Sequence, residues 1–184
     1  MPRVTVGSEE SRLVVIRGNS ASGKSSVAAG IRDRFGRGLA LVGQDNLRRV
    51  VLRERDRQGA PNIGLISTVA RYALDAGYHV VVEGILYADR YGEMLEDLAR
   101  DHRGTTRCYY LDIPLSETLA RHVTKPDPEY LAHVTERELR DWYRERDLLT
   151  SGIETVIGAD SLLKETIEFI MRDTGLAGLP PRNL

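Results

Sequence analysis

Residues 13–26, LVVIRGNSASGKSS, decide the fold. An apolar run of strand length leads into Gly-x-x-x-x-Gly-Lys-Ser, a pattern that holds phosphate groups when a strand precedes it and a helix follows it. Gly18 and Gly23 allow backbone angles that turn successive N–H groups toward phosphate oxygens. The helix that begins near Lys24 adds the positive end of its dipole. The stretch therefore predicts a loop that binds a nucleoside triphosphate, called here the phosphate loop (residues 18–26).

Two side chains of the phosphate loop are predicted to act directly on the ligand. Lys24 brings a cation to the β- and γ-phosphates, and the Ser25 hydroxyl is suited to coordinate Mg²⁺. Lysine is scarce in this chain, because Lys24, Lys125 and Lys164 are the only lysines among 26 basic residues. A glycine-rich turn that matches the pattern by chance is therefore the weaker interpretation. We expect nucleotide contacts from the whole loop: Gly18, Asn19, Ser20, Ala21, Ser22, Gly23, Lys24, Ser25 and Ser26.

Composition excludes several broad classes of protein. The chain has 184 residues, of which 41% are hydrophobic, and a formal net charge of −1. This length fits a single domain over residues 1–184 with a real core, and the net charge argues against a protein that coats nucleic acid. No apolar run approaches the roughly 20 residues of a membrane span, the N-terminus lacks the apolar core of a signal peptide, and Cys108 alone cannot form an internal disulfide. We expect a cytoplasmic protein.

Short apolar runs alternate with helix-length amphipathic stretches. The predicted strands are residues 13–16, 39–42, 80–82, 108–111 and 155–157. The predicted helices are residues 23–35, 46–57, 62–76, 89–102, 115–123, 133–149 and 160–173. Because the strands are continuously apolar and alternate with helices, they predict a three-layer α/β fold with a parallel sheet covered on both faces. The proline-containing tail, about residues 175–184, is expected to fray.

Charged residues follow the second and third predicted strands, at the sheet edge that faces the ligand crevice in such folds. Asp45 is predicted to accept a hydrogen bond from an acceptor hydroxyl and take its proton, although a simple helix cap is the alternative. Arg48, one helical turn later, would hold a polar or anionic group of the acceptor or a phosphate oxygen. Glu83 would hold the water shell of Mg²⁺ or an acceptor hydroxyl, or else be satisfied by a backbone amide.

A basic segment follows the fourth predicted strand. Arg121 and Lys125 are four residues apart on one helical face, and we expect both to contact phosphates from a lid segment, about residues 121–145, that excludes water. A second arginine set could complete this lid, but i,i+4 pairing on a solvated helix is the favoured interpretation for it: Arg137, Arg140 and Arg144. Trp142 and Tyr143 could stack on a substrate ring or cover the base, but packing of Trp142 into the core is the favoured interpretation.

Four segments together resemble small P-loop kinases, the group that contains chloramphenicol phosphotransferase and the zeta-toxin-like kinases: GNSASGKSS, VGQDNLRR, VVVEG and SETLARHVTKP. The resemblance implies a five-stranded sheet in the order 2-3-1-4-5, ATP as donor and Mg²⁺ as metal. It also implies that Asp45 is the general base and that Arg121 contacts ATP phosphates. Lys125 stands where arginine is commoner in the lid, and the chain lacks room for the accessory regions of full zeta toxins.

The leading hypothesis is an ATP- and Mg²⁺-dependent phosphotransferase. Lys24, Asp45 and Arg121 would serve catalysis, and the acceptor would be a hydroxyl of an antibiotic, nucleoside, sugar or nucleotide sugar. The absence of an Asn-Lys-x-Asp segment argues against a signalling GTPase, but the sequence leaves ATP or GTP preference open. A regulatory ATPase module and a nucleic-acid end kinase remain as alternatives, and the chain could be a monomer or a dimer.

Overall fold

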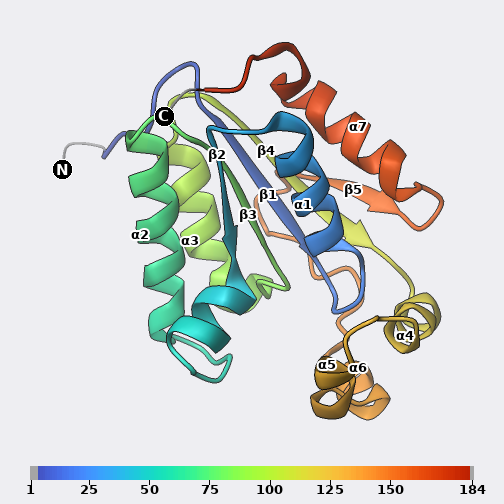
Figure 1. Cartoon of the computed structure of the whole chain (residues 1–184). Coiled ribbons are helices and arrows are strands. Elements are labelled where there is room, and N and C mark those ends of the chain that lie inside the picture. Colours follow the sequence, from blue (N-terminus) through green and yellow to red (C-terminus); the bar gives the residue numbers. More distant parts are fainter. Residues whose placement is uncertain (1–3, 183–184) are drawn as a thin grey trace.

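The computed structural model describes residues 4–182, whose centre is a parallel sheet of five strands (Figure 1). The strands are β1 (Arg12–Gly18), β2 (Leu39–Gly43), β3 (His79–Gly84), β4 (Thr105–Asp112) and β5 (Glu154–Gly158). Their order is β2-β3-β1-β4-β5, and every neighbouring pair is parallel, which confirms the expected order. The phosphate loop, which follows the central strand, therefore lies in the middle of the carboxyl edge.

Two pairs of helices cover the two faces of the sheet (Figure 1). One face packs against α1 (Lys24–Phe35) and α7 (Leu163–Asp173), and the other against α2 (Pro61–Asp75) and α3 (Ala88–Asp101). The central strand shows why its sequence is continuously apolar. Val14 and Ile16 belong to the first core and Leu13 and Val15 to the second, because successive side chains of a strand point to opposite faces.

The remaining helices lie at the carboxyl end of the strands (Figure 1). They are the π-helix η1 (Asn46–Val51), α4 (Leu115–Val123), α5 (Pro128–His133) and α6 (Glu136–Trp142). The helix expected over 46–57 is wrong beyond residue 51, because Arg53 has a left-handed φ of 52° and cannot continue it. The helix expected over 133–149 is also wrong at both ends. Thr135 caps α6 through a capping box with Glu138, and Tyr143 is extended.

The described part of the C-terminal tail does not fray as expected. Residues Leu176–Gly178 form a short 3₁₀ helix, η2, and the Leu176 side chain is buried in the core beside α1 and α7. The Arg182 N–H donates to the Arg37 carbonyl over 2.9 Å. Burial of one leucine and a backbone hydrogen bond hold this segment against the end of α1, so the prediction of a frayed tail from proline content alone is wrong. Residues 183–184 of the predicted tail lie outside the described part.

No helix within residues 4–182 is long and apolar enough to cross a membrane.

Candidate active site

The phosphate loop has the backbone conformation that its glycines permit. Gly18 and Gly23 have φ values of 150° and 99°, and Ala21 is also left-handed at 60°. A Cβ atom at Gly18 would lie 2.8 Å from the Leu111 carbonyl oxygen, so no other residue fits there without displacement. A positive φ at a non-glycine residue carries strain, which the surrounding structure must hold in place. The loop is therefore already bent for anion binding without a ligand.

Lys24 is buried beneath the loop. Its side chain bends back so that Nζ donates to the Asn19 carbonyl over 2.7 Å and lies 3.3 Å from Ser22 Oγ. Burial lowers the pKa of Lys24 to about 8, although the nearby carboxylates of Glu83 and Asp45 oppose that change. The ammonium group is therefore charged at neutral pH and poorly solvated, which suits it to bind an anion.

Ser25 and Glu83 place two oxygen atoms that could bind a metal ion beside Lys24. The Ser25 hydroxyl donates to Glu83 Oε2 over 3.2 Å, and burial raises the pKa of Glu83 against the opposing charge of Lys24. A hydroxyl and a carboxylate are oxygen ligands of the kind Mg²⁺ takes. Within residues 4–182, no cluster of three His, Cys, Asp or Glu side chains could hold a metal by itself. Mg²⁺ is usually held by one or two protein groups together with substrate phosphates.

A pocket of about 320 Å³ opens at this point and is called here the phosphate pocket. Ten of the fourteen predicted site residues line it: Ser20, Ala21, Gly23, Lys24, Ser25, Ser26, Asp45, Glu83, Arg121 and Lys125. Gly18, Asn19, Ser22 and Arg48 do not line it. Residues separated by a hundred positions in sequence therefore meet around one cavity.

Asp45 and Arg48 form an ion pair at the end of β2. Arg48 Nη2 lies 3.0 Å from Asp45 Oδ1, and Arg48 Nη1 donates to the Glu54 carbonyl over 3.2 Å. The Asp45 side chain is 66% exposed and makes no capping hydrogen bond to η1, so the capping alternative is wrong. Asp45 thus lines the phosphate pocket while Arg48 pairs with its Oδ1 and Arg49 Nη1 lies 4.0 Å from its Oδ2.

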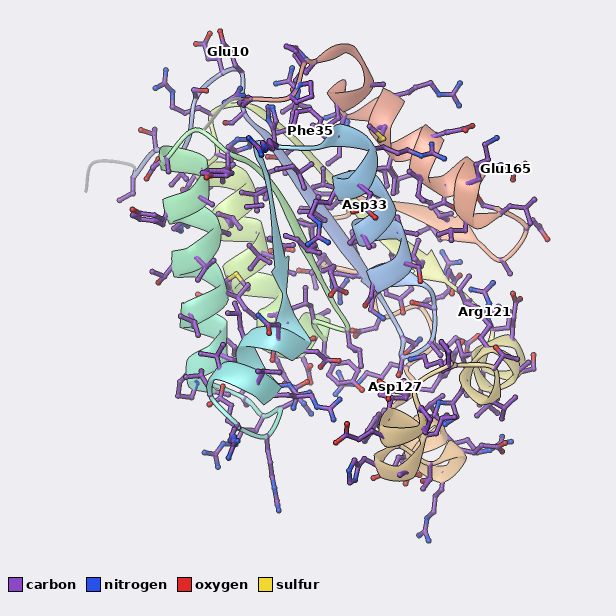
Figure 2. The ribbon with its side chains drawn as sticks, viewed as in Figure 1. Glu10, Asp33, Phe35, Arg121, Asp127 and Glu165 are labelled. Atoms are coloured by element: carbon purple, nitrogen blue, oxygen red, sulfur yellow. The ribbon has the colours of Figure 1, made fainter. Side chains whose placement is uncertain are left out.

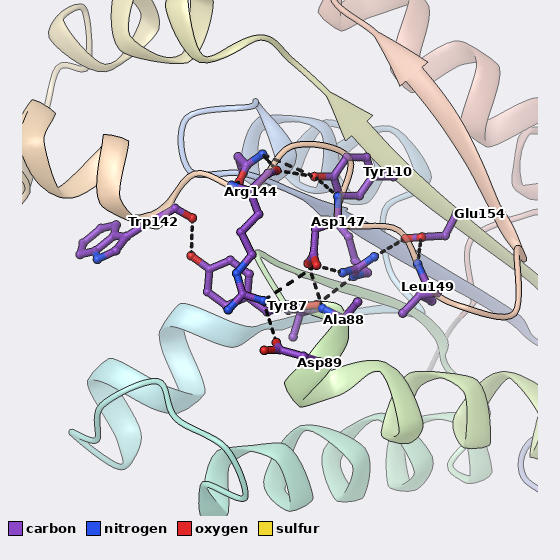
Figure 3. A network of polar contacts seen from close by, with 12 residues as sticks. Tyr87, Ala88, Asp89, Tyr110, Trp142, Arg144, Asp147, Leu149 and Glu154 are labelled. Atoms are coloured by element: carbon purple, nitrogen blue, oxygen red, sulfur yellow. Dashed lines mark hydrogen bonds and ion pairs between the residues drawn. The ribbon is translucent and has the colours of Figure 1, made fainter.

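Arg121 reaches the phosphate loop from α4 (Figure 2). Its Nη1 donates to the Ser22 carbonyl over 3.1 Å, and its Nη2 pairs with Glu117 on the same helix. Arg144 takes a different position, away from the phosphate pocket. It lies 3.9 Å over the Tyr87 ring and pairs with Asp89 over 2.8 Å (Figure 3). Of the lid arginines considered from the sequence, Arg121 is the one that lines the pocket.

Sequence analysis did not predict the buried polar network around Arg17, whose partners Asp147 and Glu154 are labelled in Figure 3. Arg17 has no exposed surface, and its guanidinium pairs with Glu154 over 2.7 Å and Asp147 over 3.1 Å. The Asn19 side chain joins the same region, because it donates to the Arg144 carbonyl over 2.7 Å and accepts from the Arg144 N–H over 2.9 Å. This network fixes the returning end of the lid to the phosphate loop. An arginine placed between an apolar strand and Gly18 was the available signal.

Trp142 is not a core residue. It is 39% exposed, and its contribution to the network is its carbonyl, which accepts from the Tyr87 hydroxyl over 2.6 Å (Figure 3).

A second cavity, of about 340 Å³, adjoins the phosphate loop on the other side of Arg121. It is lined by Ser26, Ile113, Ile157, Ala159, Leu162 and Thr166, among others. Apolar side chains with a few hydroxyls and backbone groups form a surface suited to a flat heterocycle. Because Arg121 lines both cavities, a ligand with a ring in one and phosphates in the other would pass beneath it.

The match to a family model covers most of the chain, including every residue that lines the phosphate pocket. An AAA-domain model matches residues 13–149. The chain belongs to this family. None of the curated proteins searched matches the sequence.

Several solved structures share the fold. The *Mycobacterium tuberculosis* APS kinase CysC, in complex with AMPPNP and APS, is 21% identical with a TM-score of 0.65, and the match covers 95% of this chain and 99% of that one. A sugar kinase from *Janibacter* is 18% identical (TM-score 0.63; 91% and 97% covered). The *Deinococcus radiodurans* tunicamycin resistance protein is 20% identical (0.61; 94% and 100%). These likenesses confirm the P-loop fold that the sequence resemblance implied.

Proposed function

We propose that this protein is an ATP- and Mg²⁺-dependent phosphotransferase that moves the γ-phosphate to a hydroxyl of a small molecule. The observation that carries the proposal is the convergence of Lys24, Asp45 and Arg121 on one pocket. A lysine and an arginine there neutralise phosphate charge, and an exposed carboxylate faces the same space. A protein that only bound nucleotide would have no need of that carboxylate.

Five side chains of the phosphate pocket have a place in the transfer. Backbone amides of the phosphate loop and Lys24 hold the β- and γ-phosphates, and Arg121 neutralises charge on the group in transit. Ser25 and Glu83 would hold Mg²⁺, which supplies further neutralisation of the phosphates when bound. Asp45 orients the acceptor hydroxyl and takes its proton as the new P–O bond forms and the bond to the leaving diphosphate breaks.

The two cavities support ATP as donor. The base would occupy the apolar cavity beside β5, and the phosphates would reach the phosphate pocket under Arg121. The APS kinase of the same fold binds the ATP analogue AMPPNP together with APS, which supports a bisubstrate arrangement in this chain as well. The acceptor would lie on the Asp45 side, near Ile85 and Arg48.

The test is transfer of labelled γ-phosphate from ATP to a panel of antibiotics, nucleosides, sugars and nucleotide sugars. Asp45→Asn should lower transfer by about 10²-fold or more while ATP affinity stays within about threefold, because the base is lost and the donor site remains. Asp33→Asn is the matched control, since Asp33 is an exposed carboxylate on α1, outside the pocket (Figure 2). Equal turnover of Asp45→Asn and wild type would remove Asp45 from the mechanism. ATP hydrolysis with no acceptor phosphorylated would favour a regulatory ATPase.

A further inference from the structure

Tyr130, in the lid helix α5, contacts the phosphate loop and has no role in the mechanism above. Its hydroxyl oxygen lies 3.2 Å from Ser20 Oγ. The Lys125 ammonium lies 3.9 Å from the centre of its ring, and the His122 ring packs edge-on against it at 5.7 Å. Tyr130, Lys125 and Ser20 all line the phosphate pocket. Tyr130 thus contacts both the Lys125 cation and the phosphate loop.

The local sequence fixes Tyr130 in this position. Asp127 caps α5 by accepting the Tyr130 backbone N–H over 3.0 Å, and Pro128 occupies the first turn, where its missing N–H costs nothing. The buried His122 supports the ring from α4. The cap therefore fixes the backbone of α5 at Tyr130, and His122 from α4 contacts the ring.

Lys125 needs such a partner. A lysine is a compact charge on a flexible four-carbon stem, and it lacks the planar fork with which arginine fixes itself on phosphates. An aromatic face restricts an ammonium group by attraction to the ring, by an amount equivalent to about a 2- to 5-fold change in binding for partly exposed pairs. The Lys125 charge acts on Lys24 and lowers its pKa, which agrees with two cations facing one pocket.

We propose that Tyr130 is a positioning residue that holds Lys125 over the phosphate pocket and seats the lid on Ser20. The proposal rests on the proposed function insofar as the pocket binds a triphosphate. The two groups of Tyr130 have different roles: the ring orients Lys125, and the hydroxyl joins α5 to the phosphate loop. This role also explains how a lysine can bind phosphates at a position where the planar fork of an arginine would fix its own orientation.

The test is a double-mutant cycle on affinity for AMPPNP with Mg²⁺, measured by calorimetry. Tyr130→Leu should weaken binding about 2- to 5-fold, Lys125→Met should weaken it by at least as much, and the double variant should be no weaker than Lys125→Met alone. Tyr130→Phe keeps the ring, so it should retain most of the affinity. Tyr72→Leu is the matched control, because Tyr72 is an exposed tyrosine on α2, and it should bind as wild type does.

The outcomes separate this proposal from the proposed function. If Tyr130→Leu binds AMPPNP as tightly as the wild-type protein does, the role of Tyr130 is overturned and the phosphotransferase proposal still stands. Additive losses in the double variant also overturn it, because Tyr130 would then act independently of Lys125. If wild type does not bind AMPPNP, both proposals fail. Should Tyr130→Leu not fold, Tyr130→Phe and Lys125→Met decide the matter: a loss in Tyr130→Phe equal to that in Lys125→Met contradicts the role of the ring.

Discussion

Replacing Lys24 with methionine should make the ligand-free protein more stable while removing nucleotide binding. Lys24 is 7% exposed, and burial lowers its pKa from 10.5 to about 8. Holding a charged lysine there consequently costs the folded state free energy, which bound phosphates would offset. Methionine has a similar length and no charge, so it removes that cost without leaving a large cavity.

The magnitude follows from the pKa of Lys24. Because one pH unit of pKa change corresponds to about 1.4 kcal/mol, the lowered pKa corresponds to about 3 kcal/mol at pH 7. Loss of the hydrogen bond from Nζ to the Asn19 carbonyl returns about 1 kcal/mol. The net expectation for Lys24→Met is a free energy of unfolding about 2 kcal/mol higher, or a Tm higher by about 4–8 °C for a chain of this size.

The lowered pKa of Lys24 also determines how the stability difference between Lys24→Met and wild type changes with pH. The folded pKa lies below the unfolded one, so between about pH 8 and 10.5 the unfolded state binds more protons and wild-type stability rises with pH relative to the variant. The higher free energy of unfolding of Lys24→Met should be fully present below pH 8 and should vanish near pH 10.

Urea denaturation without nucleotide, at pH 7 and pH 10, measures this difference in the free energy of unfolding. Lys164→Met is the control, since Lys164 is 78% exposed. A Lys24→Met variant less stable than wild type at pH 7 would refute the reasoning.

Three further perturbations test other parts of the site. Arg17→Met should lower the free energy of unfolding in urea by about 3–5 kcal/mol, because Asp147 and Glu154 lose the buried cation they share and keep the backbone N–H groups of Ala88 and Leu149 as partners, with Arg144 3.9 Å from Asp147. Asn19→Ala should lower it by about 2 kcal/mol and also weaken AMPPNP binding, since both bonds to the Arg144 peptide are lost. Glu83→Gln should raise the Mg²⁺ concentration needed for half-maximal transfer by about tenfold or more, measured by Mg²⁺ titration of the transfer assay.

Each of these predictions has a result that contradicts it. A neutral Arg17→Met would mean that the buried ion pairs contribute nothing beyond packing. An Asn19→Ala variant that loses stability but binds AMPPNP normally would limit Asn19 to a structural role. An unchanged Mg²⁺ requirement in Glu83→Gln would remove Glu83 from the metal site.

The elements close to the phosphate loop could be predicted from the sequence because their signals are local. The apolar run ending at Ile16 and the glycine-bounded loop determine a strand, a turn and a helix within about 25 residues. The order of the strands came from the family resemblance rather than from periodicity. Asp45 and Glu83 were found because parallel strands bring their carboxyl ends to one edge, so a charged residue just after an apolar run marks the crevice.

The features that were missed depend on partners far away in the sequence. Asn19 bonds to the peptide of Arg144, 125 positions later, and Arg17 pairs with Glu154, 137 positions later. Neither pairing has a periodic or compositional signal. The helix predicted over 46–57 failed for a local reason, because the left-handed Arg53 ends it and arginine gives no warning of that conformation. Polar networks and irregular connections are set by tertiary structure, and they also set the position of the lid.

The central claim is that the phosphate loop binds a nucleoside triphosphate through Lys24, and calorimetric titration of the full chain with ATP and Mg²⁺ tests it most directly. The account predicts saturable heat at one site per chain, accompanied by a rise in Tm, and loss of both in Lys24→Ala. No heat and an unchanged Tm in the wild-type protein, or equal binding by Lys24→Ala, would contradict it.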